Sequence, residues 1–364
     1  MEKDLGYRKV QSTGRKSYII SLPKKWVESL GLDKGSEIAF KVQEDSSLVL
    51  TPRKILESKR ERRERKEYWV HVNPDDNVGS LRRRITSLYV VSANTIHVTF
   101  KDASTALKFR NEIHEIVKNF LLGAEIVEET PRRITIQILI DQLEFPVEKA
   151  IRRMAVLALS ASNDVISNLK DISEETARGI LMICNDVYRL SLYVTRQLKY
   201  GLERNAFKEL GFKTAKEFLG YRLVVNDVKA ISDNALNIIN NLMAIKPLIE
   251  SGTIFSKEPI DEEVYSQILD YNNHIHRLFE ESLKALFKRN YIEAERVIRE
   301  IDLARRIENQ LSVLISSKKM DPAFSSLFSL ILDNVRRMAD YGRNIAEVAL
   351  NRTVEEISIQ EPTN

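Results

Sequence analysis

The sequence predicts a multidomain, mainly α-helical protein, with a β-rich N-terminal domain, a small α/β domain and two C-terminal three-helix bundles in tandem. Three observations lead to this fold class. The chain has 364 residues, of which 30% are charged and only 12 are Gly and 9 are Pro, a composition that favours long solvated helices. Residues 146–354 carry an almost continuous helical pattern of apolar positions. Finally, one helical stretch occurs twice.

The duplicated stretch spans residues 221–242 and 328–349, and its two copies align without a gap at an offset of 107 residues. Identical residues occupy five aligned pairs of positions: Leu223/Leu330, Val228/Val335, Asp233/Asp340, Asn237/Asn344 and Ile238/Ile345. The shared apolar positions fall mostly three and four residues apart, which is the spacing of one helix face. A duplication at this long offset indicates a repeated helical unit rather than a short-period solenoid.

The length and the single cysteine limit the class of protein further. At 364 residues the chain predicts two or three domains, and its 43% of hydrophobic residues suffices for their cores. Cys184 is the only cysteine, which excludes an intrachain disulfide and a multi-thiolate metal site. Its apolar helical surroundings predict a buried, inert thiol. No apolar run approaches a membrane span, so we expect a cytoplasmic protein that is not membrane-embedded.

Charge is distributed unevenly along the chain. The formal net charge is only +4, yet residues 1–66 contain 17 Lys and Arg against 10 Asp and Glu. A basic N-terminal part on a slightly acidic body favours contact between that part and phosphate groups. The alternative is a solvated basic surface without a partner.

Residues 6–52 have the pattern of a small β-rich unit. Four strands are predicted, at residues 7–11, 17–21, 37–43 and 48–51. Pro23 opens a short helix between the two strand pairs and Gly31 closes it, the usual placement of both residue types.

This unit resembles a known family of domains. The stretch RKVQSTGRKSYIISLPKKWVESLGLDKGSEIAF, residues 8–40, is similar to the AbrB/SpoVT/MazE-type DNA-binding domain, a swapped-hairpin module. The most specific parts are the LPKKW helix start and the GLDKGSEIAF turn and strand, although Ser36 stands where members of the family often have Asp. About 45 residues bury little apolar area alone, and the resemblance implies an obligatory dimer in which two chains interleave into one core.

Six basic residues cluster on the first predicted hairpin and at the helix start. They are the predicted DNA-binding residues, namely Arg8, Lys9, Arg15, Lys16, Lys24 and Lys25. Arg can fork onto guanine or phosphate, whereas Lys supplies a point charge. Because a paired β-ribbon with such residues fits a major groove, we predict that residues 1–53 bind double-stranded DNA. The alternative is a solvated hairpin on a protein interaction module.

The next two segments differ in character. Residues 54–66 belong to a stretch with eight basic residues from position 53 on and without Pro or Gly, which predicts a charged helical linker. Residues 67–143 alternate in the order βαβαββ, which is typical of a small α/β domain with helices on one face. We assign no ligand to this domain and expect a spacer or a dimerisation role.

Residues 146–249 and 259–354 are predicted to form the first and the second three-helix bundle. The six helices are expected at residues 146–169, 173–203, 214–247, 259–289, 292–316 and 322–352. Both copies of the duplicated stretch, together with NDVYRLSLYVTRQLK at residues 185–199, resemble PhoU-like proteins, which carry two three-helix bundles in tandem. This resemblance implies a role in phosphate uptake and phosphate homeostasis.

The resemblance also bears on metal binding. In PhoU-like proteins a carboxylate commonly precedes the signature Asp by four residues, and the pair helps to bind a metal cluster. Here Asp233 and Asp340 occupy the signature position, but Lys229 and Arg336 stand four residues before them. Each Asp is therefore predicted to pair with the cation of its own helix. Asp233 and Asp340 are the candidate metal ligands, and we expect no cofactor.

Together, these features predict a cytoplasmic homodimeric transcription regulator of phosphate uptake. Its AbrB-like head binds DNA, while its PhoU-like body senses or relays phosphate status in contact with a phosphate transporter or a signalling protein. The alternative is a PhoU-like adaptor that acts on such a partner and uses the head only for dimerisation. We expect no enzyme, because the sequence contains no nucleotide-binding loop and no recognisable nucleophile or metal motif.

Overall fold

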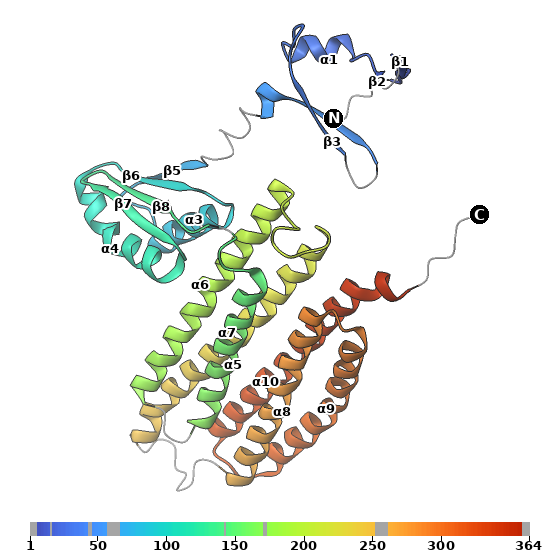
Figure 1. Ribbon diagram of the computed structural model, residues 1–364. Helices are drawn as coiled ribbons and strands as arrows, with labels where there is room; N and C mark the ends of the chain where they lie inside the picture. Colours follow the sequence, from blue (N-terminus) through green and yellow to red (C-terminus); the bar gives the residue numbers. More distant parts are fainter. Residues whose placement is uncertain are drawn as a thin grey trace. The chain divides into compact units, whose positions relative to one another are not determined.

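The computed structural model describes residues 6–14, 17–42, 46–56, 66–141, 143–169, 173–251 and 261–358. The chain divides into two compact units, Met1–Lys66 and Glu67–Asn364 (Figure 1). The first contains short strands and short helical segments, and the second contains a small sheet followed by long helices. This arrangement confirms the predicted fold class.

The N-terminal unit consists of two β-hairpins joined by a short helix. Its elements are β1 (Gln11–Thr13), β2 (Ser17–Ile19), α1 (Lys24–Ser29), β3 (Ile38–Val42) and β4 (Leu48–Pro52). β1 pairs antiparallel with β2, and β3 pairs antiparallel with β4. Pro23 precedes the first turn of α1, and Gly31 follows its end at φ +58°, in the left-handed region that glycine tolerates.

The first strand of the first hairpin lies later in the chain than the sequence predicts. The strand expected at 7–11 is found at Gln11–Thr13, and residues 6–10 lie outside any strand. Its register runs from Gln11 opposite Ile19 to Thr13 opposite Ser17. The alternation of polar and apolar residues did not fix this register, because neither face of the hairpin is buried within the chain. Of the predicted linker, residues 57–65 lie outside the described residues.

The second unit begins with the α/β domain. Its elements are β5 (Glu67–Val72), α3 (Val78–Val90), β6 (Thr95–Phe100), α4 (Ala103–Phe120), β7 (Ala124–Thr130) and β8 (Arg133–Ile138). They follow the predicted βαβαββ order. The strands lie side by side in the order β5-β6-β8-β7, with β5 and β6 parallel and the other pairs antiparallel.

Helices α3 and α4 cover one face of this sheet. Alternate strand residues such as Val70 and Val98 are fully buried in one core with Ile85 and Phe109 of the two helices. Side chains at the intervening positions lie on the opposite face, where Trp69 of β5 is exposed and those of β6 are partly exposed. The alternation of apolar and polar residues that predicted these strands therefore reflects a sheet with one face in the core and the other face not covered by α3 and α4.

Six long helices form two bundles of three, which lie side by side (Figure 1). Their bounds are α5 (Val147–Ser167), α6 (Glu174–Arg204), α7 (Glu217–Glu250), α8 (Glu262–Lys288), α9 (Tyr291–Ser317) and α10 (Pro322–Ile357). These bounds follow the predicted ones to within a few residues. Several helices begin at side-chain caps, for example Ser173, which accepts a hydrogen bond from the Thr176 amide, and Asp321, which accepts one from the Ala323 amide.

The two bundles share one continuous core, and the duplicated helices α7 and α10 pack against each other at its centre. Gly220 permits their close approach, because a Cβ atom there would lie 2.5 Å from Val348 Cγ1. The α/β domain packs on α6, where Tyr188 and Leu192 join its core. Within the described residues, none of the helices has both the length and the apolar character that crossing a membrane requires.

Candidate functional site

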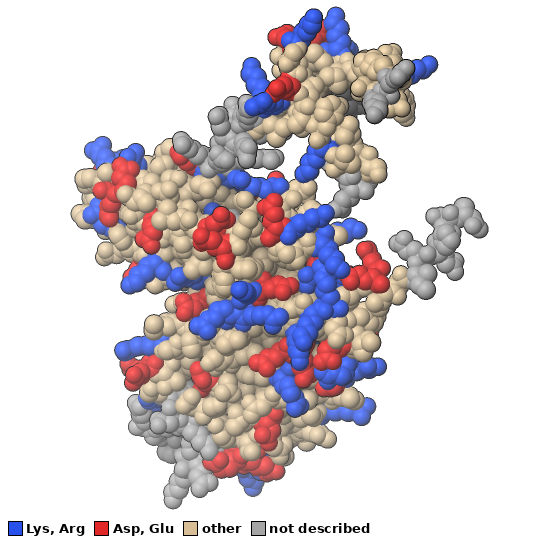
Figure 2. Space-filling model, in the orientation of Figure 1, with Lys and Arg blue, Asp and Glu red and all other residues tan. Residues whose placement is uncertain are grey.

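The predicted DNA-binding residues lie around the first hairpin and the start of α1. Arg8 and Lys9 precede β1, while Lys24 and Lys25 occupy the first turn of α1, and all four are exposed. Lys24 lies 3.7 Å from Glu28, an exposed pair that contributes little to stability. Arg15 and Lys16 lie outside the described residues. Figure 2 shows Lys and Arg side chains on the surface of the head.

The N-terminal unit has almost no core of its own. Among its described residues only Pro52 is buried. Phe40 and Val42 project from β3 and are 64% and 70% exposed, and the side chain of Leu48, opposite Val42, is exposed as well. An apolar hairpin face of this kind is unstable in water without a partner surface.

The signature aspartates are engaged in ion pairs within the second unit. Asp233 pairs with Lys229 of the same helix. Arg336 Nη1 donates to Asp340 Oδ2 at 2.9 Å, and Arg305 of α9 lies 3.5 Å from the same carboxylate. The predicted pairing of each Asp with its own helix's cation is therefore confirmed. Across the described residues, no three His, Cys, Asp or Glu side chains come together as a metal site would require.

A different carboxylate lies buried where the two bundles meet. Asp227 of α7 is 6% exposed, and Asn344 Nδ2 of α10 donates a hydrogen bond of 3.2 Å to its Oδ2. Burial raises the pKa of Asp227 to about 6, although the hydrogen bond from Asn344 opposes the rise. The offset of 107 places Asn334 at the equivalent position of α10. Asn334 is also buried, and its Nδ2 has no hydrogen-bond partner among the described residues.

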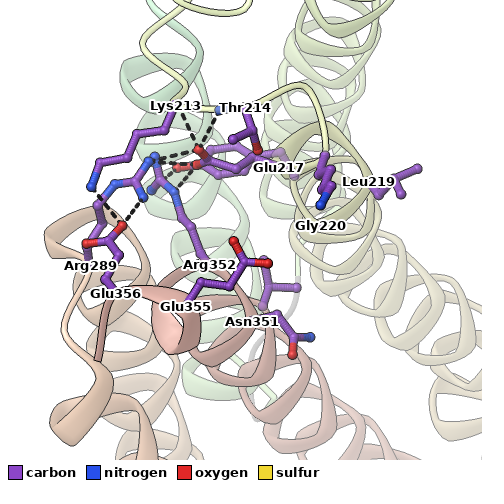
Figure 3. Close-up of a pocket in the computed structure, with 13 residues that line it drawn as sticks. Lys213, Thr214, Glu217, Leu219, Gly220, Arg289, Asn351, Arg352, Glu355 and Glu356 are labelled. Atoms are coloured by element: carbon purple, nitrogen blue, oxygen red, sulfur yellow. Dashed lines mark hydrogen bonds and ion pairs between the residues drawn. The ribbon is translucent and has the colours of Figure 1, made fainter. Parts of the chain in front are cut away.

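An ion-pair cluster joins the bundles at one end (Figure 3). Glu217, at the start of α7, accepts hydrogen bonds from Nη2 of Arg289, the residue that caps the end of α8, at 2.8 and 2.9 Å and from Arg352 Nε of α10. Arg352 also donates to Tyr221 Oη at 2.7 Å and to the Leu286 carbonyl at 3.0 Å. The Glu217 and Arg352 side chains are 8% and 4% exposed, so solvent screens their pairing little.

The same cluster borders a surface pocket of about 530 Å³ between α7 and α10. Burial would raise the pKa of Glu217, but the hydrogen bonds from Arg352 and Arg289 outweigh it and hold the pKa below its ordinary value. Figure 3 shows Arg289, Arg352 and Glu356 meeting near Glu217, with Asn351 and Glu355 on the α10 side. Four basic and three acidic side chains line this pocket, so charges of both signs border it.

Sequence reasoning identified Asn344 as part of the duplication but missed Asp227 and Glu217. Asp227 aligns with Asn334, so the duplicated stretch itself contained the signal that both positions are polar within an apolar pattern. Glu217 gave no such signal, because it precedes the duplicated stretch and its partners come from two other helices.

Comparisons with known proteins identify the head and supply solved structures similar to the body. Residues 11–57 match the family described as antidote-toxin recognition MazE, bacterial antitoxin. The crystal structure of PhoU from Pseudomonas aeruginosa is 16% identical, with 57% of this chain and 96% of that chain covered and a TM-score of 0.47. The phosphate transport system regulatory protein PhoU from Streptococcus pneumoniae is 14% identical, with 59% and 96% covered and a TM-score of 0.45. No curated protein matches the chain.

The fold and the family match of the head define a class of multidomain protein. A MazE-like domain at residues 11–57 precedes a small α/β domain and two three-helix bundles in tandem. The predicted resemblance of the head to AbrB- and MazE-type domains is thereby confirmed.

Proposed function

We propose that this protein is a DNA-binding transcription regulator of phosphate uptake. Its MazE-like head binds DNA as a homodimer, and its helical body senses or relays phosphate status. The single observation that carries this proposal is the composition of the head, which exposes apolar and basic side chains together on a domain without its own core.

The dimer follows from the energetics of the exposed apolar side chains. For Phe40 and for Val42, exposure of the side chain to water is less favourable than full burial by about 1.5–3 kcal/mol. Interleaving the hairpins of two chains would bury these side chains together with Tyr18, which is 78% exposed. Two chains would then share one core, which a unit of this size cannot build alone.

The proposal of DNA binding rests on the positive charge that the basic side chains of two copies would bring together in the dimer. Each copy contributes Arg8, Lys9, Lys24 and Lys25 among its described residues, and the predicted pair Arg15 and Lys16 would add to them. Positive charge on a paired β-ribbon is suited to the phosphates and the major-groove edges of duplex DNA. Such binding weakens steeply with salt, because each phosphate contact releases condensed counterions.

The phosphate role rests on the resemblance of the duplicated helices to PhoU-like proteins. The packing of α7 on α10 supports a relay function, since one interface joins both bundles through Asp227 and Asn344 and through the Glu217 cluster. A ligand or partner that favours one packing arrangement of such an interface over another would shift the population toward the favoured arrangement.

In the alternative function, the protein is an adaptor that still dimerises through its head but does not bind DNA. It is favoured by one observation, namely that the exposed apolar residues of the head explain dimerisation without any role for its charge. In that case the basic side chains are solvated, and their removal leaves the function of the body unchanged.

Binding of the full chain to a pool of duplex DNA separates these two functions. We expect binding that weakens with added salt and that falls sharply when Arg8, Lys9, Arg15 and Lys16 are changed to Ala. The salt slope should fall by about one for each phosphate that the variant no longer neutralises. The matched control changes four basic residues of the body instead, at Lys149, Arg153, Lys199 and Lys216. Equal affinities of the two variants would refute DNA binding by the head and favour the adaptor.

A further inference from the structure

The sheet of the α/β domain has two edge strands, β5 and β7, and they are built differently. β7 contains a bulge between Ile126 and Glu128 and carries acidic side chains, of which Glu129 pairs with Arg110 at 2.8 Å. Bulges and charges are the usual devices that prevent an edge from pairing with another chain. β5, with the sequence EYWVHV, has no proline, no lysine and no irregularity in its pairing with β6. The edge at β7 is therefore guarded. The edge at β5, the open edge, is covered less: among the described contacts, the Arg84 side chain donates a hydrogen bond to its His71 carbonyl.

The open edge also carries a large exposed aromatic side chain. Trp69 is 55% exposed on the face of the sheet that α3 and α4 leave uncovered. Its ring stacks on His97 of β6, with ring centroids 4.6 Å apart, so its orientation is defined. A rigid aromatic side chain at a strand edge is well suited to anchor a protein–protein contact.

The backbone of β5 shows which residues face outward. The His71 carbonyl accepts a hydrogen bond of 3.1 Å from Arg84 of α3, so it points away from β6. Alternate residues of a strand direct their N–H and C=O groups to the same side, which places those of Glu67 and Trp69 on the open edge as well. The same three residues share the open face of the sheet.

We propose that β5 pairs antiparallel with β5 of a second copy of this chain, in the register that places Trp69 opposite Trp69. The two tryptophans then exchange two backbone hydrogen bonds across the twofold axis. In this register Glu67 of each copy lies opposite His71 of the other. Thr99 Oγ1 lies 2.7 Å from His71 Nδ1, which leaves Nε2 for the facing Glu67 carboxylate. That carboxylate also lies 3.7 Å from His97 Nε2 of its own chain. The His71 carbonyl accepts the Glu67 N–H of the other copy beside the hydrogen bond from Arg84, because a carbonyl oxygen has two lone pairs. The pairing joins two four-stranded sheets into one of eight strands.

The choice of a second copy as the partner has two grounds. The residues of the open edge are self-complementary in this one register, acid against histidine and tryptophan against tryptophan. The second ground rests on the proposed function, because a dimer of the heads brings two chains together and β5 begins directly after Lys66. Tethering of this kind raises the effective concentration of the two strands to the millimolar range and favours a contact that is weak alone.

Cross-linking of the full chain with a short bis-maleimide tests this pairing. Cys184 is buried and burial raises the pKa of its thiol to about 12, so the native chain reacts poorly. We expect Trp69→Cys to form cross-linked dimers at a yield independent of chain concentration, about tenfold above the matched control Val127→Cys on β7, which is 50% exposed. Equal yields for the two variants would refute the pairing.

Two further variants separate this inference from the head dimer. Glu67→Lys in the Trp69→Cys background removes the carboxylate opposite His71, and it should lower the yield while the chain remains a dimer by sedimentation. An unchanged yield contradicts the register. Phe40→Asp disrupts the apolar face of the head. If that variant is monomeric, the result supports dimerisation through the head. If it stays dimeric and still cross-links through position 69, the head dimer fails while the sheet pairing holds.

Discussion

Replacing Asp227 with Asn removes one buried charge from the contact between the two bundles and should stabilise the protein. The amide has nearly the same shape as the carboxylate, and its carbonyl oxygen can still accept the hydrogen bond that Asn344 now donates at 3.2 Å. The duplication offers a precedent within the chain, since Asn334 stands at the equivalent position of α10 and is buried as well.

The size of the effect depends on pH in a defined direction. Burial raises the pKa of Asp227 from 3.8 to about 6 in the folded protein. Between these two values the folded state holds a proton that the unfolded state has lost, so the free energy of unfolding falls as the pH rises. Above about pH 6 the loss is complete and amounts to about 3 kcal/mol. Asp227→Asn should recover up to this amount at pH 8 and gain little at pH 4.

Urea denaturation at several pH values from 4 to 8 measures the difference in the free energy of unfolding between Asp227→Asn and the native chain. Far-UV circular dichroism monitors the unfolding through the signal of the six long helices. The matched control is Asp233→Asn on the same helix, because the Asp233 side chain is 54% exposed and its surface pair with Lys229 contributes about 1 kcal/mol or less. We expect the control to keep the pH dependence of the native chain. A variant at position 227 that is less stable at pH 8, or that keeps the full decline between pH 4 and pH 6, would refute the reasoning.

Three other predictions follow from the same structure. Arg352→Met should lower the free energy of unfolding by about 3 kcal/mol in the same denaturation assay, because it removes one of the two arginines that pair with the buried Glu217; a loss no larger than that of an exposed arginine contradicts this role. Elemental analysis of the purified chain should find substoichiometric transition metal, since Lys229 and Arg336 replace the expected carboxylates; several metals per chain that are lost on Asp233→Ala would overturn this expectation. Insertion of a flexible Gly/Ser stretch after Lys66 should leave DNA affinity intact but abolish its response to phosphate status, and a response that persists would show that no rigid link is needed.

Much of the fold could be predicted from the sequence because its signals are local. The period of apolar residues gave the six helices and the four strands of the α/β domain, since each of these elements buries one face in a core of the same chain. The pairing of Asp233 with Lys229 could also be predicted, because four residues on one helix bring side chains together regardless of tertiary structure.

The remaining features depend on contacts that local patterns do not encode. The strand at Gln11–Thr13 was misplaced because its hairpin buries neither face within one chain. Asp227 and Glu217 were missed because their partners are distant in sequence, and Asn344 and Arg352 reach them only after α10 packs on α7. The open edge at β5 became visible only when the strand order placed β5 at the margin of the sheet.

The central claim is that a DNA-binding head reports phosphate status, and genome-wide crosslinking of the protein to DNA tests it most directly. The measurement compares phosphate-rich with phosphate-starved cells, using the native chain and the variant in which Arg8, Lys9, Arg15 and Lys16 are changed to Ala. We predict that the native chain occupies sites near phosphate-uptake genes, that occupancy changes with phosphate supply, and that the variant loses these sites. Absence of native-chain occupancy above that of the variant, or occupancy unaffected by phosphate, would contradict the account.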